Sequence, residues 1–238
     1  MIKNTAIALS FTMLFSALSF FITAPAVQAE EFSADIITEM DTGGVSGKLY
    51  VKSNQVNRNE VMGMITIMNR PHVYQVFPNT KKYQVTDVAE LEKENPMAGA
   101  ADFPAWAKKN NMQKTGTETI EGFACDIYEG TVILDKKSGQ STPMKFWLSR
   151  KLQYPIKTQS IMPPPVGRVT THLKNIKTGK QPDHLFTVPE GYTKAASMEQ
   201  AMGMPDMEQL SEGQMPSAEQ MDNMMKQVQE MMKNMQQE

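Results

Sequence analysis

Residues 32–53, FSADIITEMDTGGVSGKLYVKS, contain the pattern that decides the fold. In the second half of this stretch, Leu49 and Val51 alternate with residues that favour solvent, so they fall on one face of an extended chain. Such alternation is typical of a β-strand that is buried on one face. Turn-forming residues at positions 41–44 separate this run from an earlier strand-like run. We therefore expect an antiparallel hairpin between residues 32–40 and 47–53.

Strand-like segments continue on both sides of one helical insertion. The pattern predicts a short helix at Val88–Glu94, a loop at residues 96–104 and one or two further helical turns at residues 105–111. Strands are expected before the insertion at 56–62, 64–68, 73–77 and 82–88, and after it at 117–120, 125–134, 144–149, 156–162 and 168–176.

Pro163, Pro164 and Pro165 cannot donate ladder hydrogen bonds, so they predict a corner between the last two strands. About ten strands in hairpin order predict a mainly β (α+β) fold. We expect one antiparallel sheet, rolled into a half-open β-barrel and closed on one side by a helical plug.

The first 29 residues have the pattern of a cleavable signal peptide. Lys3 precedes an uncharged apolar run at positions 6–23, and residues 27–29 form a small-residue cleavage site. An apolar run of about eighteen residues is also near the length that spans a bilayer. Pro25 and the cleavage site favour cleavage after Ala29. No cysteine follows that site, as lipid attachment would require, so we expect a periplasmic, soluble, non-lipidated protein.

The composition restricts the function classes. With 24 basic and 26 acidic residues, no electrostatic steering towards nucleic acid or anionic membrane is expected. The single cysteine, Cys125, excludes a disulfide framework, and we expect it to be a small buried hydrophobe rather than a reactive thiol. We predict one domain at residues 30–195, followed by a Met- and Gln-rich tail at residues 196–238.

We expect the tail to be disordered as far as Pro216 and then helical from Ser217. Beyond Ser217 the methionines recur on one face of the predicted helix, at positions Met221, Met224, Met225, Met231, Met232 and Met235. Three interpretations remain open: an adaptable surface that binds a partner, a helix that packs on its own chain or on a second copy, and a soft-metal site for Cu(I).

No catalytic motif stands out. The sequence contains neither a G-x-S-x-G elbow nor an H-E-x-x-H pair, a phosphate-binding glycine loop or a Cys/His cluster with metal-ligand spacing. We expect the histidines at 72, 172 and 184 to be exposed or edge-strand polar residues. Glu118 and Glu121 are expected to be surface charges rather than an acid/base pair. The protein is therefore predicted to be no enzyme and to use no cofactor.

The order of strands, helical insertion and later motifs resembles the LolA/LolB lipoprotein-carrier superfamily. The resemblance covers roughly residues 32–192 and rests on the segments GKLYVKSNQVNR (47–58), MITIMNRPHVYQVFPNTKKY (64–83), GFACDIY (122–128), LKNIKTG (173–179) and LFTVPEGY (185–192). In that family an Arg-Pro pair ends the second strand, and its arginine controls the lid; the matching position here is Ser53. Arg58 matches the arginine that follows, whereas Arg70 and Pro71 lie one strand too late.

The resemblance implies an incomplete barrel with an apolar concave cavity, and hence a non-enzymatic carrier of lipid or lipoprotein acyl chains. The cavity residues predicted on this basis are Leu49, Val51, Ile65, Ile67, Ile133 and Trp147, with Arg58 at a polar mouth. Sequence alternation leaves open which face is concave and whether side chains fill the cavity. Two other functions also remain open: a module of the same fold that senses envelope stress, and a protein that handles Cu(I) through its methionine tail.

Overall fold

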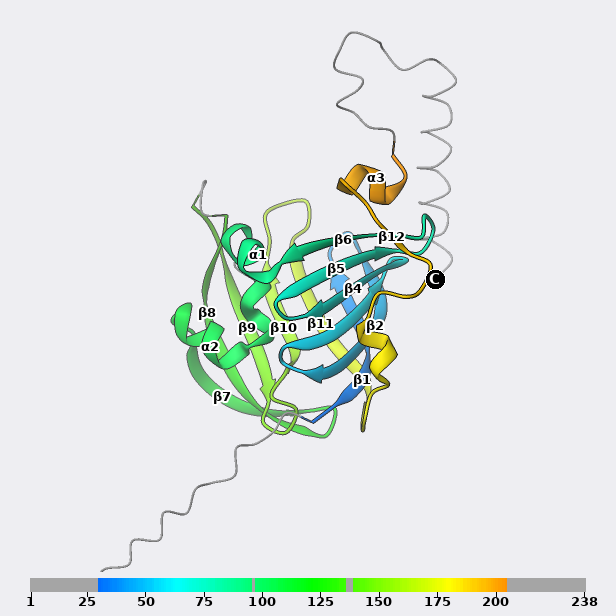
Figure 1. Ribbon diagram of the computed structural model, residues 1–238. Coiled ribbons are helices and arrows are strands. Elements are labelled where there is room, and N and C mark those ends of the chain that lie inside the picture. The colour runs from blue at the N-terminus through cyan, green and yellow to red at the C-terminus, as the bar shows by residue number, and fades with distance from the viewer. Residues whose placement is uncertain (1–29, 96, 136–138, 205–238) are drawn as a thin grey trace, which may run out of the picture.

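A computed structural model describes residues 30–95, 97–135 and 139–204 (Figure 1). Their strands form one sheet of twelve, in the order β12-β6-β5-β4-β3-β2-β1-β11-β10-β9-β8-β7. The bounds are β1 (Phe32–Met40), β2 (Gly43–Ser53), β3 (Val56–Val61), β4 (Met64–Asn69), β5 (His72–Phe77), β6 (Lys82–Asp87), β7 (Gln113–Ile120), β8 (Phe123–Asp135), β9 (Gln140–Ser149), β10 (Pro155–Ile161), β11 (Arg168–Thr178) and β12 (Thr193–Lys194).

Neighbouring strands are antiparallel, apart from the short parallel pair β12–β6. The two ends of the sheet, β12 and β7, do not pair with each other in the described part of the chain. Strands β4–β6 run across the direction of β8 and β9, so the sheet is strongly rolled (Figure 1). The mainly β, half-open antiparallel barrel expected from the sequence is confirmed.

Several strands are longer than the sequence pattern predicts. Strand β7 begins at Gln113 instead of residue 117, and β9 begins at Gln140 instead of residue 144. The added residues are mostly exposed, so backbone pairing extends these strands without the apolar alternation that sequence patterns detect. Strand β2 begins at Gly43, whose φ of 135° is open to glycine alone, so the turn after β1 consists of residues 41–42. The three prolines lie in the corner between β10 and β11, as predicted.

The helical insertion lies between β6 and β7 and covers the inner face of the sheet. It consists of α1 (Val88–Glu94), the 3-10 helix η1 (Ala98–Ala101) and α2 (Phe103–Lys109), so part of the predicted loop at 96–104 is helical. The rings of Phe103 and Trp106 lie 5.0 and 5.2 Å from the ring of Phe146 on β9. This aromatic cluster holds α2 against the C-terminal half of the sheet. The helical insertion corresponds to the helical plug that the sequence predicts.

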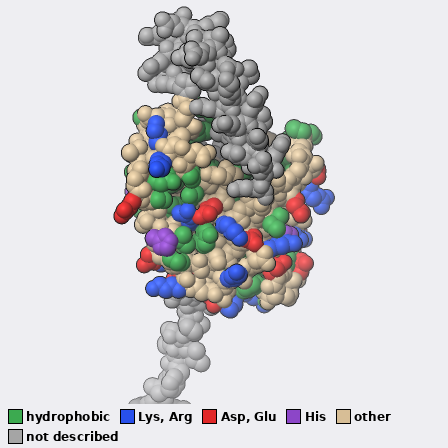
Figure 2. All heavy atoms as spheres, turned by 90° about the vertical axis from the view of Figure 1, so that its right-hand side faces the viewer, with side chains coloured by type: hydrophobic (Ala, Val, Ile, Leu, Met, Phe, Trp, Pro, Cys, Tyr) green, Lys and Arg blue, Asp and Glu red, His purple; other side chains and the backbone are tan. Residues whose placement is uncertain are grey.

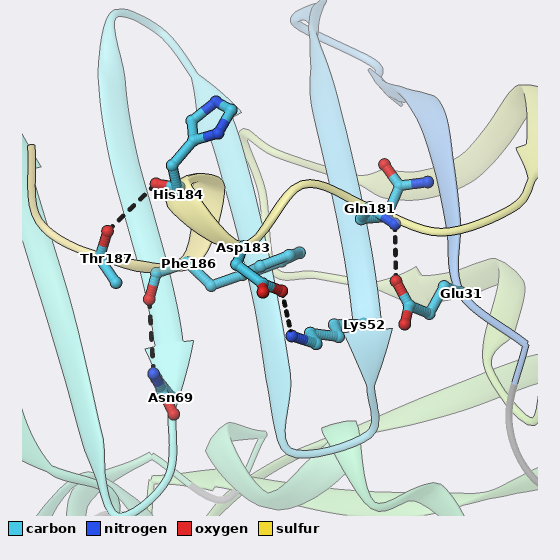
Figure 3. A network of polar contacts seen from close by, with 8 residues as sticks. All are labelled: Glu31, Lys52, Asn69, Gln181, Asp183, His184, Phe186 and Thr187. Carbon is cyan, nitrogen blue, oxygen red and sulfur yellow. Dashed lines mark hydrogen bonds and ion pairs between the residues drawn. The ribbon is translucent and has the colours of Figure 1, made fainter.

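The outer face is covered by an extended segment, residues 181–204, which we call the strap. It includes η2 (Asp183–Phe186), β12 and the helix α3 (Met198–Met202). Figure 3 shows it crossing the outer face of the strands, with Asp183 paired to Lys52 and the backbone N–H of Gln181 donating to Glu31 at 2.6 Å. Phe186 is buried there with Ile67 of β4 and Val76 of β5.

The strap extends into the predicted tail. Helix α3 begins after Ser197, whose side chain accepts from the backbone N–H of Gln200, and it ends at Gly203 with a left-handed φ of 77°. Ala201 is fully buried, and its carbonyl accepts from the Thr80 hydroxyl at 2.6 Å. Residues 196–204 therefore lie against the domain.

Charged side chains of both signs are interspersed on the strap side of the molecule (Figure 2). This mixture agrees with the nearly balanced composition of the sequence, whose formal net charge is −2. The face seen in Figure 2 therefore presents no broad basic surface to a polyanion.

Candidate functional site

A cavity of about 460 Å³ lies between the inner face of the sheet and the helical insertion. The sheet contributes Ile36, Leu49, Val73, Ile156 and Leu173, and the insertion contributes Val88, Leu91 and Met97. Its volume falls within the range of roughly 300–1,000 Å³ that is typical of small-molecule sites. The inner face therefore contains a space that side chains leave unfilled.

Strand register explains why these residues meet. Ala34 pairs with Leu49 across β1 and β2, and Ile36 pairs with Leu173 across β1 and β11. Residues directly opposite each other in antiparallel strands project to the same face. Apolar side chains from β2, β1 and β11 therefore form one continuous wall.

The cavity lining carries almost no charge. Among the described residues, those that line it include no Asp, Glu, Lys or Arg. Tyr154 lines it, and burial raises the pKa of this phenol to about 12, so the hydroxyl stays protonated at neutral pH. The cavity is thus suited to a ligand with large apolar surface.

A polar strip interrupts the apolar lining on β3 and β4. Asn57 and Asn59 of β3 and Thr66 of β4 all line the cavity. Asn57 is only 3% exposed, and Oδ1 of Asn59 is buried without a hydrogen-bond partner. Unpartnered buried acceptors are rare in proteins and point to a missing donor.

The predicted cavity residues lie in several places. Leu49 lines the cavity, while Val51 is buried beside it, opposite Phe32. Ile65 and Ile67 lie on the outer face, where they belong to the cluster around Phe186. Ile133 is 51% exposed at the far end of β8. The set predicted from the sequence is corrected accordingly, because alternation separates two faces without telling which one is concave.

Trp147 also does not line the cavity. Its neighbour Phe146 does, and successive strand residues point to opposite faces. The Trp147 indole N–H donates to Glu118 at 2.6 Å, and the ammonium groups of Lys145 and Lys157 lie 5.0 and 4.6 Å from its ring. Trp147 is therefore held by cation–π contacts and one hydrogen bond.

Arg58, predicted at the mouth of the cavity, lies instead on the outer face beneath the strap. Its Nε donates to Glu60 at 2.6 Å, and its Nη1 donates to the Leu185 carbonyl at 3.1 Å. It alternates with Asn57 and Asn59, which face inwards. Arg58 thus anchors the strap, and its predicted role at a polar mouth is corrected.

Sequence reasoning missed the residues supplied by the insertion, such as Leu91 and Met97, and the polar strip of β3. Asparagines at inward positions contradict the rule that the buried face is apolar, so alternation alone does not identify the inner face of VNRNEV (residues 56–61). The six tail methionines and the predicted signal peptide lie outside the described residues.

The described residues offer little reactive chemistry. Cys125 is fully buried, and burial raises the pKa of its thiol. The described ranges contain no group of three or more His, Cys, Asp or Glu residues placed to hold a metal ion. In the same ranges, no helix has the length and hydrophobicity needed to cross a bilayer.

Residues 26–154 match a protein family described as a domain of unknown function, DUF4412. No curated protein matches the sequence. Solved structures that resemble the chain include an uncharacterised conserved protein from Thermus thermophilus, with a TM-score of 0.47, 10% identity, and coverage of 70% of this chain and 90% of that one.

Two other solved structures are similar at comparable levels. A LolA superfamily protein from Nitrosomonas europaea has a TM-score of 0.36 and 12% identity, over 66% of this chain and 90% of that one. The lipoprotein LppX from Mycobacterium tuberculosis has a TM-score of 0.36 and 10% identity, over 63% and 88% of the two chains. The superfamily that the sequence resembles is thus represented among the structures similar to this chain.

Proposed function

The chain belongs to the DUF4412 family, and we propose that it is a non-enzymatic binding protein of the bacterial envelope that holds lipid or lipoprotein acyl chains in its inner-face cavity. The observation that carries this proposal is the cavity of about 460 Å³, whose described lining is apolar over most of its surface and free of Asp, Glu, Lys and Arg. Such a site binds by burial and needs no covalent chemistry.

Burial of an acyl chain provides sufficient free energy for this function. Each methylene group removed from water contributes about 0.8 kcal/mol, so about eight of them contribute roughly 6 kcal/mol. Part of this gain offsets the translational and rotational freedom lost on association. We expect reversible binding, which suits a protein that must release its cargo.

The helical insertion forms one wall of the cavity, and we expect its position to control whether a ligand binds there. Arg70 in the turn between β4 and β5 donates to Glu92 of α1 at 2.9 Å, and this ion pair fastens α1 over the cavity. Leu91 of the same helix lines the cavity. A ligand that enters here has to be accommodated by α1 and η1.

Features of the sequence support a location in the envelope. The signal-peptide pattern at residues 1–29 favours export to the periplasm, and the missing cysteine after it favours a protein without a lipid anchor. The methionine face at Met221–Met235 remains a predicted contact surface for an envelope partner.

A fluorescent fatty-acid probe tests the proposal. Ala100 lines the cavity, so Ala100→Trp should fill it and weaken probe binding at least tenfold. Ala105 of α2 is exposed, so Ala105→Trp introduces the same side chain outside the cavity and should leave binding unchanged. Circular dichroism checks that both variants keep their strand content. Absence of probe binding by the unmodified protein, or equal binding by both variants, would contradict the proposal.

A further inference from the structure

We infer that the cavity prefers acylated ligands whose headgroup is uncharged and donates hydrogen bonds, such as the hydroxyl groups of an acylglycerol. This inference rests on the proposed function and specifies the ligand of the same site. It is carried by three observations: a ladder of amide and hydroxyl side chains, an unpartnered acceptor, and a lining without charged groups.

The ladder runs across four neighbouring strands. Asn59 of β3 pairs with Thr66 of β4, Thr66 with Gln75 of β5, and Gln75 with Gln84 of β6. Since directly paired residues project to the same face, all four belong to the inner face. Asn59 and Thr66 line the cavity, and Gln75 and Gln84 continue the ladder towards the β6 edge of the sheet.

The ladder and the apolar wall meet side by side. Asn59 is paired with Leu49, which in turn is paired with Ala34. One row of the sheet therefore changes from apolar side chains on β1 and β2 to polar side chains on β3–β6. A ligand with an apolar chain and a polar end matches this division.

Asn59 supplies the specific acceptor. Its Oδ1 is buried without a hydrogen-bond partner in the described structure. A buried acceptor loses its water on folding, and a ligand hydroxyl or amide N–H would restore the missing hydrogen bond. A carboxylate or a phosphodiester offers no donor to Oδ1.

The lining also disfavours ionic headgroups. Apart from His172 and Tyr154, the described lining contains no ionisable side chain. His172 is on β11, three strands away from Asn59. A phosphate, carboxylate or ammonium group placed beside Asn59 would therefore lose its hydration without gaining a partner of opposite charge there. Hydroxyl and amide groups avoid this cost because the ladder can both donate to them and accept from them.

Calorimetric titration with three ligands of equal chain length tests the inference: a monoacylglycerol, the corresponding fatty acid and a lysophosphatidylcholine. All three titrations use the same buffer and pH. We expect the monoacylglycerol to bind at least tenfold more tightly than either charged ligand. Absence of binding by all three would contradict the proposed function, whereas equal binding would contradict only the headgroup preference.

Asn59→Leu removes the acceptor and keeps the branching and the number of side-chain heavy atoms. It should reduce the preference for the monoacylglycerol over the fatty acid about tenfold. Asn79 is exposed in the turn between β5 and β6, so Asn79→Leu is the matched control and should not alter the preference. An unchanged preference in a folded Asn59→Leu protein would overturn the role of Asn59.

Uncharged hydrogen-bond donors occur in free lipids, as the hydroxyl group of diacylglycerol, and in lipoproteins, as the peptide N–H groups next to the cysteine that carries the diacylglyceryl group. A peptide with a thioether-linked diacylglyceryl group, titrated beside free diacylglycerol, distinguishes the two sources. Tighter binding of the peptide identifies lipoproteins as the ligand, and tighter binding of the free lipid identifies membrane lipids. Failure to bind either would overturn the inference.

Discussion

The two faces of the sheet both bury large apolar side chains, but the uncharged cavity of about 460 Å³ lies on the inner face, whereas a hollow of about 650 Å³ on the outer face is lined by charged side chains such as Lys48 and Glu60. On the outer face, Ile67, Val76 and Phe186 are almost fully buried, and the strap fills the space above β3–β6. On the inner face, Leu49 and Ile156 are equally inaccessible to bulk solvent, but they line a space of about 460 Å³.

The difference lies in the two covers. The strap is mostly extended, so it follows the curvature of the strands and inserts side chains directly between theirs. The inner cover consists of short helices, which are about 10 Å wide and cannot follow a rolled sheet closely. Phe103 and Trp106 bring α2 into contact with β8 and β9, and α1 and η1 span the remaining gap. The part of the outer face under the extended strap is therefore a packed core, whereas the part of the inner face bridged by short helices retains a cavity.

Removal of the strap should have the largest effect. A chain that ends at residue 180 loses the cover of the outer cluster and the buried Ala201, so we expect a loss of more than about 4 kcal/mol in the free energy of unfolding. A chain that ends at residue 204 keeps all of these contacts and should unfold within about 0.5 kcal/mol of the full chain. Urea denaturation followed by circular dichroism measures both. Equal stability of the two shortened chains would show that the strap is not part of the core.

Truncation of one large side chain on each face compares the covers directly. Phe186→Ala should cost about 3–5 kcal/mol, because Phe186 is only 3% exposed within a packed cluster. Leu91→Ala should cost clearly less, about 1 kcal/mol, because Leu91 already borders unfilled space. Ligand binding should respond in the opposite order, with Leu91→Ala weakening it more. Equal stability losses would indicate that the inner face is packed as tightly as the outer one.

Arg58→Met should destabilise the protein by about 2 kcal/mol, because it leaves Glu60 without its partner and releases the Leu185 carbonyl. Since Arg58 lies on the outer face, binding of the fatty-acid probe should not change once the fraction of folded protein is taken into account. Lys48→Met, at a more exposed ion pair with Asp35, is the control and should cost less than about 1 kcal/mol. A selective loss of probe binding in Arg58→Met would restore Arg58 to the mouth of the cavity.

The smallest effect on stability is expected at the β7 end of the sheet, where ion pairs between side chains add to the stability that the strap and the helical insertion provide. Burial raises the pKa of Asp126, but hydrogen bonds from Arg150 and Lys114 outweigh it and hold this pKa below its usual range. The resulting stability is present above the usual carboxyl pKa of about 3.9 and is lost as the pH falls through the lower pKa of the folded state. Asp126→Asn should cost about 1 kcal/mol at neutral pH and should flatten the loss of stability below about pH 4. An unchanged acid profile in this variant would assign the acid sensitivity to other carboxylates.

Most strands and their hairpin neighbours were predictable, whereas the pairing of β1 with β11, far apart in the chain, was not predicted. Alternation in residues 47–53, the turn at residues 78–81 and the three prolines after β10 are local signals, and each depends on backbone and side-chain preferences within a few residues. The buried state of Cys125 followed in the same way from its position in a strand-like run. Strand ends at Gln113 and Gln140 were missed, because exposed polar residues pair through backbone groups that every residue possesses.

The sequence by itself therefore determined that Leu49 and Val51 share one face and that Arg58 lies opposite Asn57 and Asn59, since strand geometry dictates this alternation. Only the tertiary structure decided which face became the cavity. That decision depends on where residues 88–109 and 181–204 pack, far along the chain from the strands that they cover. Because both covers bury apolar side chains, alternation in the strands does not tell which segment covers which face, and the position of the cavity follows from the shape of its cover.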